Sequence, residues 1–96
     1  MIGVLANMTV AEGKQEEFEN VARDLMAKVK ANEPGCLIYN LCKKRGSETE
    51  YTFMEQYTDA AALDAHGKTE YFQAAFPKLG ACLAGKPELI VLDAIQ

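Results

Sequence analysis

Among its 96 residues the chain has no tryptophan, only one histidine and only three cysteines. A structural metal site needs several close ligands, and the lone histidine has no cysteine or carboxylate partner nearby in the sequence, so we expect no metal. Cys36, Cys42 and Cys82 form no CxxC pair, and the first two would lie roughly 20 Å apart on one strand, too far to bridge. We therefore expect reduced thiols in a cytoplasm. The sequence also lacks a glycine-rich phosphate loop and a Ser-His-Asp arrangement.

An excess of positive charge is also missing. Ten lysines and arginines stand against fourteen acidic residues, which gives a net charge of −4. Nucleic acids and anionic membranes require a basic footprint, so we expect neither as a partner. The N-terminus has no basic region of an export signal, and no apolar run approaches the length of a membrane span. These absences predict a soluble, cytoplasmic protein.

The pattern along the chain predicts one domain over residues 1–96, with strands at 2–10, 36–44, 50–57 and 88–95. A first helix should follow the turn at residues 11–14, and the segment Asn32-Glu33-Pro34-Gly35 should stop it, because Pro34 and Gly35 suit the central positions of a type II turn. Its buried stripe has helical spacing. The stripe consists of Phe18, Val21, Ala22, Leu25, Met26 and Val29.

The second helical region should begin at a cap formed by Thr58 or Asp59, pause at Gly67 and restart at Thr69. We expect Pro77 to kink or loosen it, because proline removes a backbone donor. The residues expected to be buried in this part are Phe72, Phe76 and Leu79, and Leu37, Tyr39 and Leu41 should share one face of the second strand.

The element order β-α-β-β-α-β predicts an α+β, ferredoxin-like fold. The last strand is apolar on both faces from Leu89 to Leu92, which is typical of a strand covered on both sides. Two helices cover only one face of a four-stranded sheet. We therefore expect a homodimer in which the second sheet covers the other face, a dimeric α+β barrel.

Chemistry is concentrated between Tyr51 and Phe72. This stretch reads as a strand that ends in Glu55 and Tyr57, a capped turn, and a short helix that carries His66. A histidine at a strand-to-helix junction can hold or move a proton near neutral pH. Glu55 has two interpretations from the residues alone, a general base or the partner of a lysine in an ion pair.

These residues resemble those of the antibiotic biosynthesis monooxygenase (ABM) family of dimeric α+β barrels, which includes small quinol monooxygenases. The matching pieces are Gly13-Lys14, Glu17-Phe18, Glu33-Pro34-Gly35-Cys36, Tyr39, Phe53-Met54-Glu55-Gln56-Tyr57, Asp59, Ala62, His66, Thr69 and Phe72. The resemblance implies oxidation of a quinol or polycyclic phenol by dioxygen without metal or flavin. It implies Asn7 and His66 as catalytic residues, and the substrate-binding set is Tyr39, Phe53, Glu55, Tyr57 and Phe72.

Two departures from the family pattern bear on function. Tyr57 stands where members often have tryptophan, which leaves the stacking partner of the substrate open. Haem-degrading relatives carry an iron-ligating histidine near the position of Phe76, so we do not expect haem degradation. Two other functions remain open. One is isomerisation of a phosphorylated sugar derivative, for which the basic segment at residues 43–45 would have to face the cavity, and the other is non-catalytic binding of a reactive small molecule.

Overall fold

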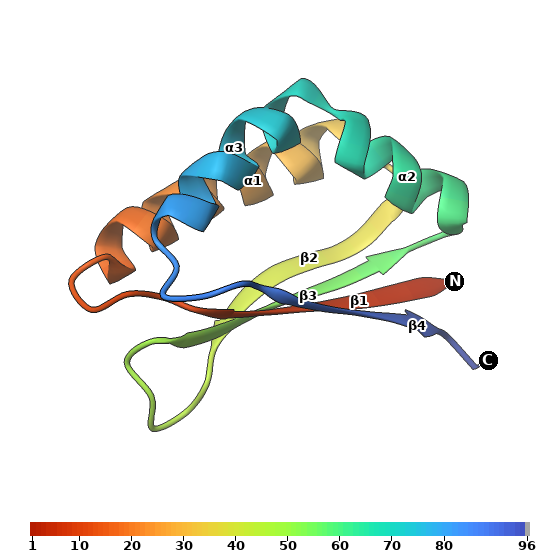
Figure 1. Ribbon diagram of the computed structural model, residues 1–96. Helices are drawn as coiled ribbons and strands as arrows, with labels where there is room; N and C mark the ends of the chain where they lie inside the picture. Colours follow the sequence, from red (N-terminus) through yellow and green to blue (C-terminus); the bar gives the residue numbers. More distant parts are fainter. Residues whose placement is uncertain (96) are drawn as a thin grey trace.

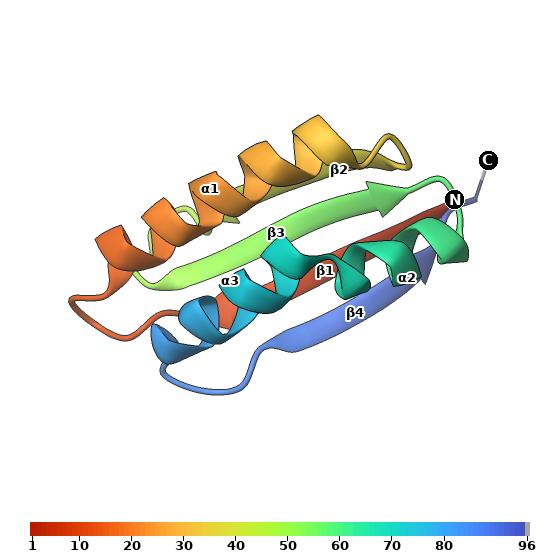
Figure 2. The same ribbon diagram turned by 90° about the horizontal axis from the view of Figure 1, so that it is seen from above.

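The computed structural model describes residues 1–95 and has the predicted ferredoxin-like order (Figure 1). The elements are β1 (Ile2–Thr9), α1 (Gln15–Asn32), β2 (Cys36–Lys43), β3 (Glu50–Tyr57), α2 (Ala60–Lys68), α3 (Glu70–Ala81) and β4 (Glu88–Asp93). The strands form one sheet in the order β2-β3-β1-β4, and every neighbouring pair is antiparallel. The helices lie together on one face of this sheet (Figures 1 and 2).

The helix boundaries follow local signals in the sequence. The turn before α1 places Gly13 at a φ of 88°, a conformation that glycine adopts without steric cost. Asp59 caps α2 by accepting a hydrogen bond of 2.8 Å from the backbone N–H of Ala62. Thr69 ends α2 and begins α3, because its hydroxyl donates to the carbonyl of His66 and accepts from the N–H of Phe72. The break between α2 and α3 is therefore at Thr69, and Gly67 belongs to α2.

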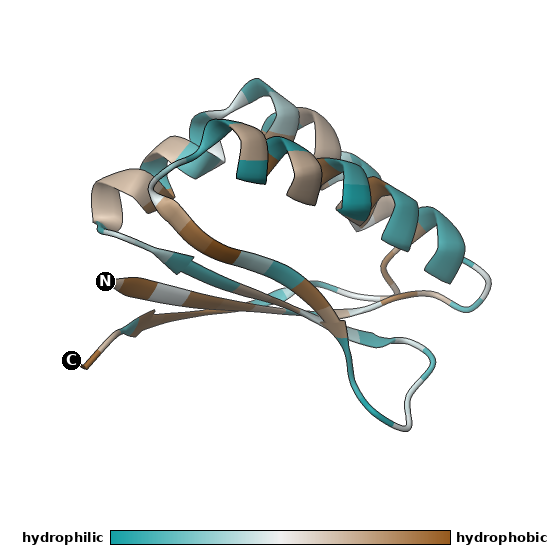
Figure 3. Ribbon diagram, turned by 180° about the vertical axis from the view of Figure 1, so that it is seen from behind, coloured by the Kyte–Doolittle hydropathy of each residue, from teal (hydrophilic) through white to brown (hydrophobic). Residues whose placement is uncertain are grey.

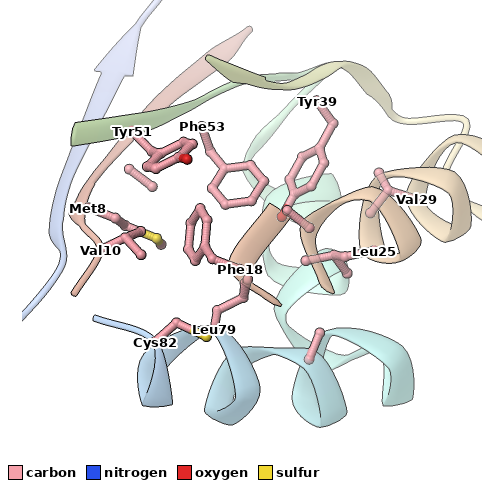
Figure 4. Packing of buried hydrophobic residues seen from close by; sticks show 13 residues of the cluster. Met8, Val10, Phe18, Leu25, Val29, Tyr39, Tyr51, Phe53, Leu79 and Cys82 are labelled. Carbon is pink, nitrogen blue, oxygen red and sulfur yellow. The ribbon is translucent and has the colours of Figure 1, made fainter. Parts of the chain in front are cut away.

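The hydrophobic core lies between the helices and the sheet (Figure 4). Phe18 of α1 is fully buried, and its ring centroid is 4.9 Å from that of Tyr51 and 6.4 Å from that of Phe53. Such tilted aromatic pairs add to the free energy gained from burial alone. Val4, Ala6, Met8 and Val10 are also buried, which shows that the even-numbered positions of the first strand face the helices.

Three expectations for individual segments are corrected. Phe76 is not buried but 39% exposed, and the buried positions of α3 are Ala75 and Leu79. Leu37 is 50% exposed, because the register of β2 shifts between Cys36 and Ile38. The strand β4 ends at Asp93 rather than at residue 95. Pro77 lies inside α3, which continues to Ala81.

The helices leave the opposite face of the sheet uncovered (Figure 1), and hydrophobic residues make up much of β1 and β4 (Figure 3). Side chains of alternating strand positions project from it. Exposed apolar residues at these positions include Ile38, Met54, Ile90 and Leu92. All six residues of β4 are exposed, on both of its faces, and the strand lies at one edge of the sheet (Figure 2). None of the helices within residues 1–95 has the length and apolar character of a membrane-spanning segment.

Candidate active site

A cavity of about 140 Å³ lies between the sheet and the two C-terminal helices. Its walls come from Tyr39 of β2, Phe53 and Glu55 of β3, His66 at the end of α2 and Phe72 of α3. Phe76 and Leu89 also line it, and both of these side chains are substantially exposed. The cavity is therefore mostly apolar, with two groups on its walls that can carry a proton.

His66 is held in an aromatic cage. The residue is only 3% exposed, and its ring centroid lies 5.0 Å from that of Tyr39, 5.6 Å from that of Tyr57 and 4.7 Å from that of Phe72. These contacts leave the imidazole little freedom to turn. His66 is the only buried residue of α2, so the short helix serves mainly to deliver this side chain.

The two ring nitrogens of His66 have different surroundings. Nδ1 lies 3.0 and 3.1 Å from the two carboxylate oxygens of Glu33. Nε2 has no hydrogen-bonding partner within residues 1–95. In this part of the chain every fully buried side-chain nitrogen or oxygen has a partner, so Nε2 is not fully buried. Nε2 is therefore open to the cavity that His66 lines.

Glu55 is the other proton carrier on the cavity wall. Burial raises the pKa of its carboxyl to about 7, against the effect of the Tyr57 hydroxyl, which donates a hydrogen bond of 2.6 Å to Oε1. The nearby Glu33 carboxylate also raises this pKa. A carboxyl group with such a pKa can give or take a proton near neutral pH.

The tyrosines at the cavity remain neutral. Burial, together with the negative charge of Glu55, moves the pKa of Tyr39 far above its ordinary value. Burial and the hydrogen bond to Glu55 do the same for the pKa of Tyr57. Both phenols can therefore donate hydrogen bonds but cannot act as bases at neutral pH.

Residues 1–78 match the sequence pattern of the family described as "Antibiotic biosynthesis monooxygenase". The chain belongs to this family. It is 35% identical over 78 residues to "Putative monooxygenase YcnE" of Bacillus subtilis, with 81% of each chain covered. It is also 31% identical over 88 residues to "Uncharacterized protein sll1783" of Synechocystis, which covers 92% of this chain but only 59% of that protein.

Solved structures agree with this assignment. The crystal structure of "a putative antibiotic biosynthesis monooxygenase" from Caulobacter crescentus superimposes with a TM-score of 0.95 at 47% identity. The match covers 99% of this chain and 90% of that one. The ABM family and the ferredoxin-like fold expected from the sequence are therefore both confirmed.

Five of the seven predicted site residues line the cavity of this ABM domain: Tyr39, Phe53, Glu55, His66 and Phe72. Tyr57 lies behind this wall, where it is fully buried and contacts both Glu55 and His66. Tyr57 therefore supports the two proton carriers instead of offering a surface on which a ligand could stack.

Asn7 is not brought together with His66 within one chain. Its register partners Thr52 and Glu88 are also its hydrogen-bonding partners. The hydroxyl of Thr52 donates to Oδ1 of Asn7 at 2.6 Å, and Nδ2 donates to Oε1 of Glu88 at 3.0 Å. Asn7 has an odd number on a strand whose even-numbered residues face the helices, so its amide lies on the open face of the sheet.

The basic segment at residues 43–45 is not among the residues that line the His66 cavity. Lys43 and Lys44 line a different pocket, together with Asn7 and Glu88. They form ion pairs with Glu48 at 3.8 Å and with Glu50 at 3.6 Å, respectively. An isomerase of a phosphorylated substrate would require a basic segment at the cavity. The residues that line the cavity include no such segment.

Sequence reasoning did not identify the roles of Glu33 and Tyr71. The hydroxyl of Tyr71 donates to Oε2 of Glu33, whose side chain is 11% exposed and also binds His66. A signal was available in principle: Glu33 places a carboxylate at the C-terminal end of α1, where the helix dipole disfavours negative charge. Within residues 1–95 no cluster of three histidine, cysteine or acidic side chains could hold a metal ion.

Proposed function

We propose that this ABM protein is a cofactor-independent monooxygenase that oxidises small hydroquinones and related phenols with dioxygen. The observation that carries the proposal is the pairing, on one apolar cavity, of the open Nε2 of His66 with the Glu55 carboxyl. Desolvation alone would raise the pKa of a bound phenol and prevent its ionisation, so such a cavity needs a base. His66 supplies it.

The size of the cavity favours a small substrate. A cavity of about 150 Å³ accommodates one benzene molecule, and the cavity here measures about 140 Å³. One aromatic ring therefore fits among Tyr39, Phe53 and Phe72. Further rings would have to project past Phe76 and Leu89, which are both exposed. We accordingly favour monocyclic hydroquinones over the polycyclic phenols that family resemblance alone includes.

The reaction begins with proton transfer from the substrate hydroxyl to Nε2 of His66. The O–H bond breaks and its electron pair stays on the phenolate oxygen. The electron-rich ring then reduces dioxygen, and one oxygen atom forms a bond to a ring carbon. That carbon loses its hydrogen as a proton while the O–O bond breaks, and the departing hydroxide takes the proton held by His66 and leaves as water. A hydroquinone and dioxygen thus give a hydroxyquinone and water, and the substrate supplies all four electrons. The protonated form of Glu55 can deliver a proton to the leaving oxygen.

Oxygen uptake tests this proposal. We expect the purified protein, free of flavin absorbance and of stoichiometric metal by elemental analysis, to accelerate oxygen uptake with monocyclic hydroquinones above the spontaneous rate. His66→Ala should lower kcat by roughly 10²-fold, the usual effect of removing a general base. Lys68→Ala is the matched control, because Lys68 lies in the same helical turn, is exposed and, among residues 1–95, forms its one ion pair with Asp64.

Two results would contradict the proposal. Hydroquinone binding without oxygen uptake above the spontaneous rate would indicate a non-catalytic binding protein. Equal rates for the parent and His66→Ala would show that the reaction does not depend on this cavity. Phosphorylated diketones serve as the contrast set, and their turnover would instead support the isomerase.

We also propose that two copies pair through the open face of the sheet. Ile38, Met54, Ile90 and Leu92 expose an apolar surface there, and such surfaces on small proteins usually mark an interface. Leu89 and Val91 are 59% and 60% exposed on the other side of β4. A partner that covers this edge would bury both faces of the strand.

A further inference from the structure

Glu33 lies where three helices meet. Its carboxylate, at the C-terminal end of α1, accepts hydrogen bonds from Nδ1 of His66 on α2 and from the hydroxyl of Tyr71 on α3. Its side chain is 11% exposed and that of His66 is 4% exposed. His66 is the one buried polar or charged residue among residues 1–95.

The position of this carboxylate is costly on its own. The backbone of Glu33 is fixed, because its N–H donates to the carbonyl of Val29 at 2.9 Å and its carbonyl accepts from Cys36 at 3.0 Å. The C-terminal end of a helix carries a partial negative charge, which repels a carboxylate. Burial adds a desolvation cost, which only hydrogen-bond donors can offset. The Nδ1–H group of His66 and the Tyr71 hydroxyl are these donors.

This arrangement fixes which nitrogen of His66 is free. A neutral imidazole has one N–H group, and the carboxylate of Glu33 can only accept, so the proton is on Nδ1. Nε2 then carries the lone pair and is open to the cavity. Free histidine in water prefers the opposite tautomer, with the proton on Nε2, in which the nitrogen facing the cavity could not act as a base.

We propose that Glu33, braced by Tyr71, is a positioning residue that holds His66 in the Nδ1–H tautomer with its basic nitrogen toward the substrate. This inference rests on the proposed function. When the substrate proton moves to Nε2, the imidazolium that forms lies 3.0 Å from the Glu33 carboxylate. The carboxylate stabilises this charge, as in other histidine-carboxylate pairs.

A glutamine in place of Glu33 would reverse this preference. The Tyr71 hydroxyl donates to the oxygen of residue 33, which directs the amide nitrogen of a glutamine toward Nδ1 of His66. That nitrogen can only donate, so Nδ1 would have to accept and the proton would move to Nε2. Glu33→Gln thus keeps the shape of the site while it switches the tautomer.

Nitrogen-15 NMR of the whole protein tests the inference directly, since the chain has one histidine and its ring signals need no assignment. At a pH where the ring is neutral, we expect the parent to show a protonated Nδ1 and an unprotonated Nε2, and Glu33→Gln to show the reverse. In hydroquinone oxidation, Glu33→Gln should lower kcat by roughly 10²-fold or more with KM within about threefold. Tyr71→Phe, which leaves the carboxylate on Nδ1, should keep the parent tautomer.

Glu16→Gln is the matched control, because Glu16 is an exposed carboxylate of the same helix that forms no side-chain hydrogen bond or ion pair among the described residues. A parent protein with the proton on Nε2 would overturn the inference, and this measurement requires no variant to fold. A folded Glu33→Gln variant that keeps the tautomer and the kcat of the parent would overturn the inference as well. The expected tautomers together with no hydroquinone oxidation by the parent would refute only the proposed function.

Discussion

Gly35 and Ala62 approach so closely that a Cβ atom added to Gly35 would lie 2.8 Å from the Cβ of Ala62. The carbonyl of Gly35 also accepts a hydrogen bond of 2.9 Å from the N–H of Thr58. The turn after α1 is thereby packed against the first turn of α2. This contact brings Glu33, two residues before Gly35, within reach of His66.

We therefore expect Gly35→Ala to destabilise the fold by about 1–3 kcal/mol, the usual cost of forcing extra atoms into a packed contact. Urea denaturation measures this change. Ala62→Gly alone should cost about 1 kcal/mol, because glycine is unfavourable in a helix. In the double variant the clash is relieved, so the total loss should be smaller than the sum of the two single losses.

Gly67→Ala is the control for this series. Gly67 lies in the same helix, and an added Cβ would meet nothing within 4 Å. The variant should be as stable as the parent or more stable by up to about 1 kcal/mol. If the stability losses of Gly35→Ala and Ala62→Gly add strictly in the double variant, the side chains at positions 35 and 62 do not clash.

The Glu55 carboxyl should make stability depend on pH. Burial raises its pKa from 4.5 to about 7, so between these values the unfolded chain has released the proton while the folded chain retains it. The free energy of unfolding therefore falls as pH rises from about 4.5 to about 7, and this contribution is constant above that range. Glu55→Gln should remove the effect, while its amide oxygen still accepts the Tyr57 hydroxyl.

Urea denaturation at pH 4.5 and pH 8 compares the variant with the parent. At pH 8 Glu55→Gln should be more stable by about 1–3 kcal/mol, and at pH 4.5 the two should differ much less. The control is Glu50→Gln, an exposed position on the same strand, for which no such difference between the two pH values is expected. The same change in stability at both pH values for Glu55→Gln would contradict the raised pKa.

Two of the three thiols should be unreactive in the folded protein. Burial raises the pKa of Cys36 to about 11, with further contributions from Glu33 and Glu55. Burial and the hydrogen bond to Glu17 also raise the pKa of Cys82. Because the thiolate is the reactive form, iodoacetamide at pH 8 should modify Cys36 roughly 10²-fold more slowly than in the urea-unfolded chain. Intact-mass and peptide mass spectrometry measure these rates, and equal rates in both states would refute the prediction.

The features predicted correctly from sequence are those that depend on near neighbours. The caps at Asp59 and Thr69 each need a side-chain oxygen and a backbone N–H three residues later, a pattern that the sequence shows directly. The apolar stripe from Phe18 to Val29 has the period of a helix. The structure buries four of its six residues and leaves Val21 and Met26 partly buried. The order of such elements was enough to give the ferredoxin-like fold.

The parts that were missed depend on residues far apart in the chain. Glu33 and His66 are separated by 33 positions, and nothing local marks them as partners. Phe76 is apolar at a helical position, but α3 leaves it at the edge of the cavity, where it is 39% exposed. The location of Asn7 could have been predicted, since the alternation of buried residues along β1 assigns Val4 and Ala6 to the helix side and Asn7 to the other side.

That location gives Asn7 a different expected role. Its amide is bound to Thr52 and Glu88 on the open face of the sheet, so we expect Asn7→Ala to change hydroquinone turnover by less than about threefold. The loss should fall on stability instead, by about 1 kcal/mol for the two hydrogen bonds. Steady-state oxygen uptake and urea denaturation measure the two effects separately. A fall in kcat as large as that of His66→Ala would show that Asn7 acts in catalysis, although within one chain it lies on the opposite face of the sheet from His66.

The open face of the sheet should be the contact between two copies of the chain. Sedimentation at micromolar concentration should show a species near twice the chain mass of 10.5 kDa. Met54 is 48% exposed on β3 and pairs in register with Leu5 and Asn40, so it lies away from the edges of this face. Met54→Lys would bury a charge in the interface and should shift the equilibrium to monomers. Ala27→Lys adds the same charge to the exposed side of α1 and should leave the dimer intact. A parent protein that stays monomeric over a wide range of concentrations would exclude the pairing. The apolar residues of β4 would then face water on both sides of the strand.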